Sequence, residues 1–154
     1  MMRVKAFLLH LAAGLGLSLA MAGPRAQEVP QPRLPTVNLS AGMHNIVAEV
    51  AQTPLQRQIG MMLRTSMAPH EGMLFVFETA SPQCFWMRNT PLPLSIAFID
   101  DDGRIVNIAE MKPRSDESHC SARPVRFALE MNQGWFAKRG LKAGFQLRGK
   151  PFGN

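Results

Sequence analysis

The most informative part of this chain is the stretch of residues 84–100, CFWMRNTPLPLSIAFID. Two aromatic residues and a methionine come directly before the polar run Arg88-Asn89-Thr90, and Pro91 and Pro93 follow. Because proline donates no hydrogen bond to a strand ladder, residues 84–89 predict a strand confined to a sheet edge or a bulge. The crowding of aromatic and polar side chains beside two prolines makes this segment the first place to look for a site.

Short strands are predicted on both sides of this stretch. Alternation of apolar and polar residues predicts half-buried strands over 46–51 and 125–131, and the run 73–77, apolar on both faces, predicts a buried one. We expect further short strands over 94–100, 104–111 and 145–148, with a glycine-containing hairpin turn at 101–103. Many short strands separated by turns indicate a mainly β fold, a sandwich or half-open barrel.

Two short helical segments interrupt the strands. Thr53-Pro54-Leu55-Gln56 predicts a helix start, with Thr53 as the cap, Pro54 in the first turn and Gln56 completing a capping box. This helix is expected to end near residues 60–63. A single helical turn is expected over 133–139, closed by Gly140.

The first residues are typical of a secretory signal. Arg3 and Lys5 precede an apolar run over 6–20, and Ala20-Met21-Ala22 is a small-x-small cleavage site. An uncleaved anchor is the alternative, but a spanning helix needs roughly 20 apolar residues. We therefore expect a signal peptide over 1–22, a Pro-rich disordered spacer over 23–42 and a single β domain over 43–154. The mature protein would be periplasmic or secreted, with no stable membrane span after cleavage.

The chain is basic, with 17 Lys and Arg against 11 Asp and Glu and a formal net charge of +6. Such a balance can indicate nucleic acid as a partner, but export argues against that partner. The charge fits either a solvated basic face or modest attraction to an anionic ligand or envelope component.

Cys84 and Cys120 are the two cysteines. In an oxidising compartment an even count predicts a disulfide. Two buried free thiols, or a metal site that adds His119, are the alternatives. The metal site is not favoured, because a closed zinc site needs four ligands and the chain has no CxxC or HxxxH spacing. Methionine is a copper(I) ligand, but no dense Met-x-Met run occurs. We expect no metal and no cofactor.

Five blocks in order carry a resemblance to a known family. They are Gly60-Met61-Met62-x-Arg64, Gly72-Met73-Leu74-Phe75-x-Phe77, Phe85-Trp86-Met87-Arg88-Asn89-Thr90, Phe98-Ile99-Asp100 and Leu129-Glu130-x-Asn132-x-Gly134. Over about residues 47–148 the chain resembles the family called domain of unknown function 192. The resemblance implies a compact β-sandwich of jelly-roll-like type and brings no assigned reaction. Two positions depart from the family pattern, since Ser95 stands where an acid is usual and Phe145 follows Gly144 where an acid is common.

Five residues of these blocks are the candidate ligand-binding residues: Arg64, Trp86, Arg88, Asn89 and Glu130. Arg64 could bind an anion through its planar fork, or satisfy helix carbonyls, or pair with Glu130. Trp86 could stack a sugar ring or a guanidinium, or belong to the core. Asn89 could stabilise the turn into Pro91 instead. Glu130 is the candidate catalytic group, as a general base or hydroxyl acceptor, and its structural alternative is an ion pair with Arg64 or Arg88.

The favoured function is a periplasmic binding or accessory module for a small polar or anionic ligand, such as a saccharide. The first alternative is an envelope-acting hydrolase with Glu130 as base and Arg64 or Arg88 stabilising negative charge. The second is a structural envelope protein without a ligand. The chain has no GxSxG elbow, and a single acid among the matching blocks does not favour a two-carboxylate glycosidase. Whether the protein is an enzyme stays open at this stage.

Overall fold

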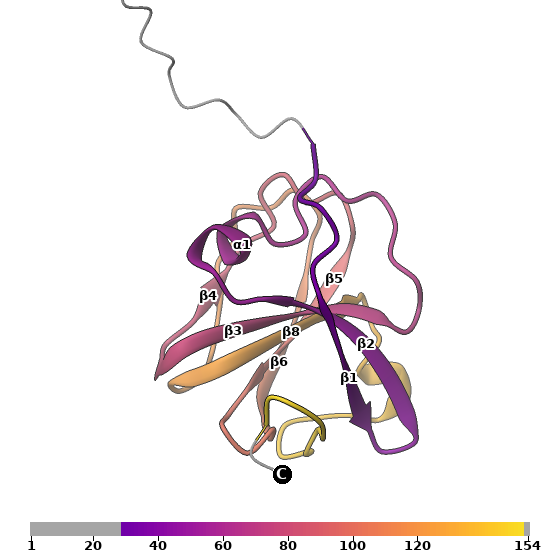
Figure 1. Ribbon diagram of the computed structural model, residues 1–154, viewed down its shortest axis with the longest axis vertical. Helices are drawn as coiled ribbons and strands as arrows, with labels where there is room; N and C mark the ends of the chain where they lie inside the picture. The colour runs from indigo at the N-terminus through magenta and orange to yellow at the C-terminus, as the bar shows by residue number, and fades with distance from the viewer. Residues whose placement is uncertain (1–28, 153–154) are drawn as a thin grey trace, which may run out of the picture.

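The computed structural model describes residues 29–152, and its main feature is one twisted, mixed six-stranded sheet (Figure 1). The elements in chain order are β1 (Thr36–Ala41), β2 (His44–Ala51), α1 (Pro54–Ile59), β3 (Glu71–Ser81), β4 (Cys84–Phe85), β5 (Leu94–Ile99), β6 (Ile105–Met111), β7 (His119–Cys120), β8 (Val125–Asn132) and the 3-10 turn Ala137–Arg139. The sheet order is β1-β2-β3-β8-β5-β6, and β4 and β7 form a separate two-stranded ribbon. The mainly β prediction is confirmed.

The sheet is open, and the segment after the 3-10 turn forms backbone hydrogen bonds with both of its edge strands, β1 and β6. Arg148 and Ser40 exchange backbone hydrogen bonds of 2.9 Å at the β1 edge. At the β6 edge, Ile105 N–H donates to the Phe145 carbonyl at 2.8 Å. Residues 145–148 therefore form isolated bridges rather than the continuous last strand that the sequence predicted. They join the β1 and β6 edges without closing a barrel.

Two hydrophobic clusters cover the two faces of the sheet. Along β8, Phe127, Leu129 and Met131 belong to the first cluster, whereas Ala128 belongs to the second. Successive side chains of a strand point to opposite faces, so Glu130 lies on the face of Ala128. β8 lies between β3 and β5, and its residues from Phe127 to Met131 are buried on both faces of the sheet. The prediction that this strand is half-buried is therefore wrong.

The folded part begins earlier than expected. Residues 36–41 form β1, so the prediction of a disordered spacer over 23–42 is wrong for this part. Leu39 and Ala41 are buried and alternate with more exposed residues, a strand pattern that follows directly after the prolines. Upstream of the strand, Gln31 donates its side-chain amide to the Gly60 carbonyl at 2.8 Å. The expected signal peptide and residues 23–28 lie outside the described residues.

The predicted helix start is confirmed. The Thr53 hydroxyl accepts from the Gln56 N–H at 3.2 Å, and the Gln56 side chain accepts from the Thr53 N–H at 3.0 Å. Gly60 ends the helix with a φ of 50°. Arg57 then fixes α1 to β3 by donating to the Val76 carbonyl at 2.8 Å. Among residues 29–152, no helix is long and apolar enough to cross a membrane.

Candidate functional site

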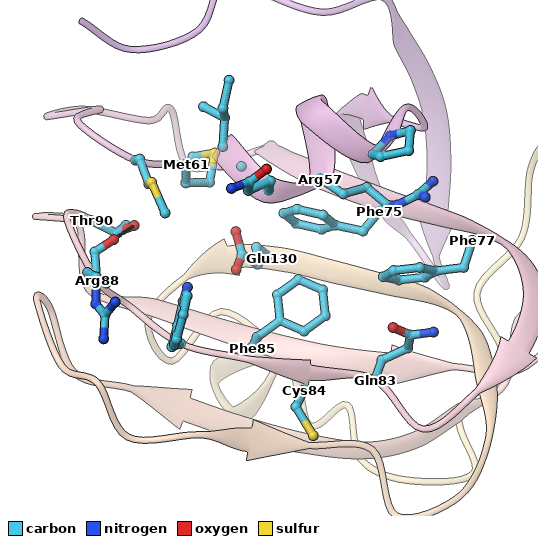
Figure 2. A pocket seen from close by; sticks show the side chains of 16 residues that line it. Arg57, Met61, Phe75, Phe77, Gln83, Cys84, Phe85, Arg88, Thr90 and Glu130 are labelled. Carbon is cyan, nitrogen blue, oxygen red and sulfur yellow. Dashed lines mark hydrogen bonds between the residues drawn. The ribbon is translucent and has the colours of Figure 1, made fainter. Parts of the chain in front are cut away.

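A cavity of about 600 Å³ lies between α1, the loop that follows it, β3, β4 and β8 (Figure 2). Three of the five predicted ligand-binding residues line it: Trp86, Arg88 and Glu130. Four aromatic side chains and two methionines supply much of the remaining wall: Phe75, Phe77, Phe85, Trp86, Met61 and Met62. The cavity thus combines an apolar wall with several polar groups, among them Arg57, Arg88, Thr90 and Glu130, and small-molecule sites likewise join apolar and polar side chains.

Glu130 is the polar group at the base of this cavity. Its side chain comes from β8 in the middle of the sheet, and the residue is 4% exposed. Figure 2 shows its carboxyl group directed into the cavity, between Thr90 on one side and Phe75 and Phe85 on the other. Oε2 is buried and has no hydrogen-bond partner within the described part of the chain. Burial raises the pKa of Glu130 to about 8, because the low-dielectric surroundings disfavour its charged form.

The aromatic wall follows from strand geometry. Phe75 and Phe77 are two residues apart on β3 and therefore point to the same face. Phe85 of β4 meets both of them edge to face, with ring centroids 4.8 Å from Phe75 and 6.4 Å from Phe77. Such T-shaped contacts are preferred because the positive ring edge meets a negative ring face. The wall is therefore built by β3 and β4 before any ligand enters.

Arg57 stands at one side of the cavity mouth. Its guanidinium lies 5.0 Å from the centroid of Phe77 and bonds Glu78 at 3.2 Å. The pKa of Glu78 is below its usual range, because its own backbone N–H and Arg57 donate hydrogen bonds to the carboxylate. Arg57 is thus held by a ring face, a carboxylate and the Val76 carbonyl. Its positive charge is already paired.

Arg88 stands at the other side of the mouth. Its guanidinium lies 4.3 Å from the centroid of Trp86 and its Nε donates to Asp116 at 2.8 Å. This hydrogen bond lowers the pKa of Asp116 and raises that of Arg88. Trp86 is 50% exposed, so the core interpretation of this residue is wrong, and its ring stacks on a guanidinium as the sequence allowed.

Arg64 lies outside the cavity. It is 8% exposed and forms a two-pronged ion pair with Glu49, with N–O distances of 2.7 and 2.8 Å. Burial alone would raise the pKa of Glu49, but hydrogen bonds from Arg64, the Leu34 N–H and Arg33 bring it below its usual range. The interpretation of Arg64 as a partner of Glu130 is therefore wrong. Arg64 joins the loop after α1 to β2.

Asn89 is also placed by the fold rather than by the cavity. It has a positive φ of 58°, and its carbonyl accepts from the Leu63 N–H at 2.8 Å. Asparagine tolerates this left-handed conformation better than most residues. The turn interpretation fits this geometry, since Asn89 does not line the cavity that contains Glu130.

A disulfide joins Cys84 of β4 to Cys120 of β7, as the sequence predicted. Both sulfurs are used by the bridge, so neither the free-thiol alternative nor the thiolate metal site holds. Cys84 lines the cavity and is followed directly by Phe85. The bridge therefore anchors the short strand that supplies part of the aromatic wall.

Sequence reasoning missed several cavity residues. Phe75 and Phe77 were assigned to a buried strand, and Arg57 to a helix with no role in a site. The two-residue spacing of Phe75 and Phe77 on one strand could have indicated that both side chains point to the same face. No local pattern indicated that α1 would stand over that face, because the contact of Arg57 with β3 is made across the fold.

Comparison with known proteins places this geometry in a family. The profile of DUF192, described as "Uncharacterized ACR", matches residues 36–149, and the chain belongs to this family. A solved structure from Sinorhizobium meliloti 1021, named a "putative transcription regulator", is 36% identical, with a TM-score of 0.73 over 77% of this chain and 97% of that chain. A protein of unknown function from Novosphingobium aromaticivorans DSM 12444 is 33% identical, with a TM-score of 0.70 over 82% of this chain and 93% of that chain. No curated protein matches the chain.

Proposed function

We propose that this protein is an exported binding or accessory module that holds a small polar ligand in the cavity above Glu130. One observation carries the proposal: Glu130 Oε2 is buried at the base of a cavity and has no hydrogen-bond partner in residues 29–152. Leaving a buried polar group unpaired costs about 1–3 kcal/mol, so native proteins seldom keep one without a reason. A polar group of a ligand would supply the missing partner.

The size and wall of the cavity support a compact ligand with a ring or an apolar body. Small-molecule sites usually enclose about 300–1,000 Å³, and about 600 Å³ falls within that range. Trp86 offers an exposed ring at the mouth, and Phe75 and Phe85 offer ring edges and faces inside. A saccharide fits this description, because the apolar face of a sugar ring stacks on aromatic side chains while its hydroxyls take hydrogen bonds.

Export is part of the proposal. The disulfide between Cys84 and Cys120 is typical of an oxidising compartment, and residues 1–22 have the composition of a secretory signal. The proposed location is the periplasm or the medium, where an envelope component would be the ligand source.

Thermal unfolding of the oxidised protein against a panel of saccharides, amines, phosphates and carboxylates tests the proposal. A ligand that binds only the folded state adds about 2.7 kcal/mol of apparent stability at a hundredfold excess over its dissociation constant. Glu130→Gln should abolish the shift, whereas Glu117→Gln, at an exposed glutamate outside the cavity, should leave it unchanged. A shift that survives Glu130→Gln would place the ligand elsewhere. A flat panel would favour a structural envelope protein without a ligand.

A hydrolase that acts on envelope material is the second candidate, and the pKa of Glu130 favours it. A carboxyl group with a pKa of about 8 is protonated at neutral pH and can serve as a general acid. Glu130 is, however, the one carboxylate among the described residues that line the cavity, so the paired-carboxylate geometry of a glycosidase is not met. Turnover of an envelope substrate that disappears in folded Glu130→Gln would establish this function in place of simple binding.

A further inference from the structure

We propose that the ligand carries a primary ammonium group on a compact ring or apolar body, and that Glu130 receives this ammonium at the base of the cavity. The inference rests on the proposed function and names the chemical class of its ligand. It follows from three features of the described residues: the unpartnered carboxyl group, the ring faces around it, and the paired state of both arginines at the mouth.

The carboxyl group and the rings together suit an organic cation. An ammonium group would donate to Glu130 Oε2, which is buried and unpartnered. Phe75 and Phe85 lie on one side of this carboxyl group, and Phe77 lies farther along the same wall (Figure 2). Aromatic faces attract cations within about 6 Å through the ring quadrupole, and the attraction grows when the pair is shielded from water. Two rings at the mouth already show this preference, because guanidinium groups lie over Phe77 and Trp86.

The cavity offers little to an anion. Arg57 is held by Glu78, and Arg88 is held by Asp116. An anionic ligand would compete with one of these carboxylates for its arginine and would lie in the same cavity as the Glu130 carboxyl group. An ammonium ligand requires neither change, since Glu130 is the acidic group of the cavity that lacks a cationic partner in the part of the chain described. This argues against the anionic ligand that the sequence left open.

Binding of a cation should be linked to release of the Glu130 proton. With a pKa of about 8, Glu130 is mostly protonated at pH 7, and an ammonium ligand selects the ionised form. The apparent affinity scales with the ionised fraction, so it should rise by about 50-fold between pH 6 and pH 8. A neutral ligand that binds the protonated form should show at most about a twofold fall over the same range.

The charged groups on the neighbouring elements do not account for such a profile. Two ion pairs stand at the cavity, Arg57 of α1 with Glu78 of β3 and Arg88 with Asp116. A third, Arg64 with Glu49 of β2, is buried outside it. The pKa values of these three acids lie below their usual range, so each stays ionised from pH 6 to pH 8. Cys84 and Cys120 are bridged and do not titrate. His119 of β7 faces Phe85 across the ribbon, and the Glu130→Gln comparison separates it from Glu130.

Isothermal titration of the oxidised protein with matched pairs tests the inference. Cyclohexylmethylammonium against cyclohexylmethanol, and glucosamine against glucose, each compare an amine with a neutral ligand of the same shape. An alkylammonium, like a lysine side chain, has a pKa of about 10, so the first pair also gives a clean pH profile from 6 to 8. Repeating each titration in buffers of different ionisation enthalpy counts the protons released.

The inference expects the amine of each pair to bind more tightly, and it expects cyclohexylmethylammonium to release close to one proton at pH 7. Glu130→Gln should remove both the preference for the amine and the pH dependence, while Glu117→Gln should keep both. If glucose and cyclohexylmethanol bind as tightly as their amine partners, the inference is overturned and the proposed function stands. If phosphates or carboxylates alone bind in a Glu130-dependent manner, the inference is also overturned. Failure of every compound overturns the inference and the proposed function together.

Discussion

Glu130 should make the protein less stable as the pH rises from 5 to 8, and Glu130→Gln should remove that dependence. Well below pH 4.5 the carboxyl group is protonated in both the folded and the unfolded chain, and it does not change the pH dependence of the free energy of unfolding. Between pH 4.5 and about 8 the unfolded chain has lost this proton while the folded chain keeps it. The folded state then binds more protons, so its stability falls with rising pH until the folded group ionises near pH 8.

The magnitude follows from the width of this window. The pKa rises from 4.5 to about 8, and each pKa unit corresponds to about 1.4 kcal/mol, which gives a loss of about 5 kcal/mol at full burial. Water admitted to the cavity would solvate the carboxylate, so we expect a measured loss of about 2–5 kcal/mol. This is a large share of the stability of an ordinary domain, about 5–15 kcal/mol in total.

Urea denaturation of oxidised wild-type protein and of Glu130→Gln at pH 5, 6, 7 and 8 measures the effect. The difference between the two proteins cancels the contributions of the histidines and of the paired acids. The variant should gain stability relative to wild type as the pH rises, with similar denaturant m-values for the two proteins. Glu117→Gln should follow wild type at every pH. A difference between wild type and Glu130→Gln that stays constant from pH 5 to pH 8 would refute the placement of Glu130 in a desolvated site.

Three further outcomes follow from the fold and are measured by denaturation. Arg64→Ala should cost about 3 kcal/mol, because it leaves the buried Glu49 carboxylate with the exposed Arg33 as its one remaining cationic partner among the described residues. Loss of the Cys84–Cys120 disulfide, by paired serine substitution, should cost about 4 kcal/mol for its 36-residue separation. Gly72→Ala should cost about 1–3 kcal/mol and loosen β3 against β8, because the added Cβ would lie 2.6 Å from the Glu130 carbonyl oxygen.

The parts of the fold that depend on neighbouring residues were predictable. The capping box at Thr53 and Gln56 is complete within four residues, and the structure forms it as expected. β8 was predicted as half-buried because Glu130 and Asn132 alternate with apolar residues. Its central place between β3 and β5 is set by long-range pairing, which local periodicity does not contain. β1 was missed because its short alternation follows a run of prolines.

The same distinction explains the site. Trp86, Arg88 and Glu130 were chosen as polar or aromatic residues in matching blocks, and the structure brings all three to one cavity. Arg64 was chosen on the same ground, but it forms an ion pair with Glu49. In the sequence Glu49 is one polar residue of an alternating strand pattern, and nothing marks it as the partner of a buried arginine. A buried arginine pairs with a carboxylate that lies close to it in the folded chain, and the order of residues in the sequence does not show which carboxylate that is.

Strand geometry also explains why Ser95 matters little to the cavity. Ser95 lies between Leu94 and Ile96 of β5, both of which belong to the cluster on the Glu130 side, so its own side chain points to the opposite face. There it donates to Glu110 at 2.7 Å and accepts from the Gly134 N–H at 2.8 Å. Glu110, directly across the ladder, also accepts from this N–H.

An acid at position 95 would therefore hold the turn at Gly134 from the far side of the sheet. In this chain the carboxylate of Glu110, on the neighbouring strand β6, accepts the hydrogen bond from the Gly134 N–H. Ser95 and Glu110 thus fix one turn from the far face of the sheet, and Glu130 is the one acid among the described residues that line the cavity. Activity or binding that depends on Glu130 should consequently survive Ser95→Ala, provided that the turn at Gly134 stays folded.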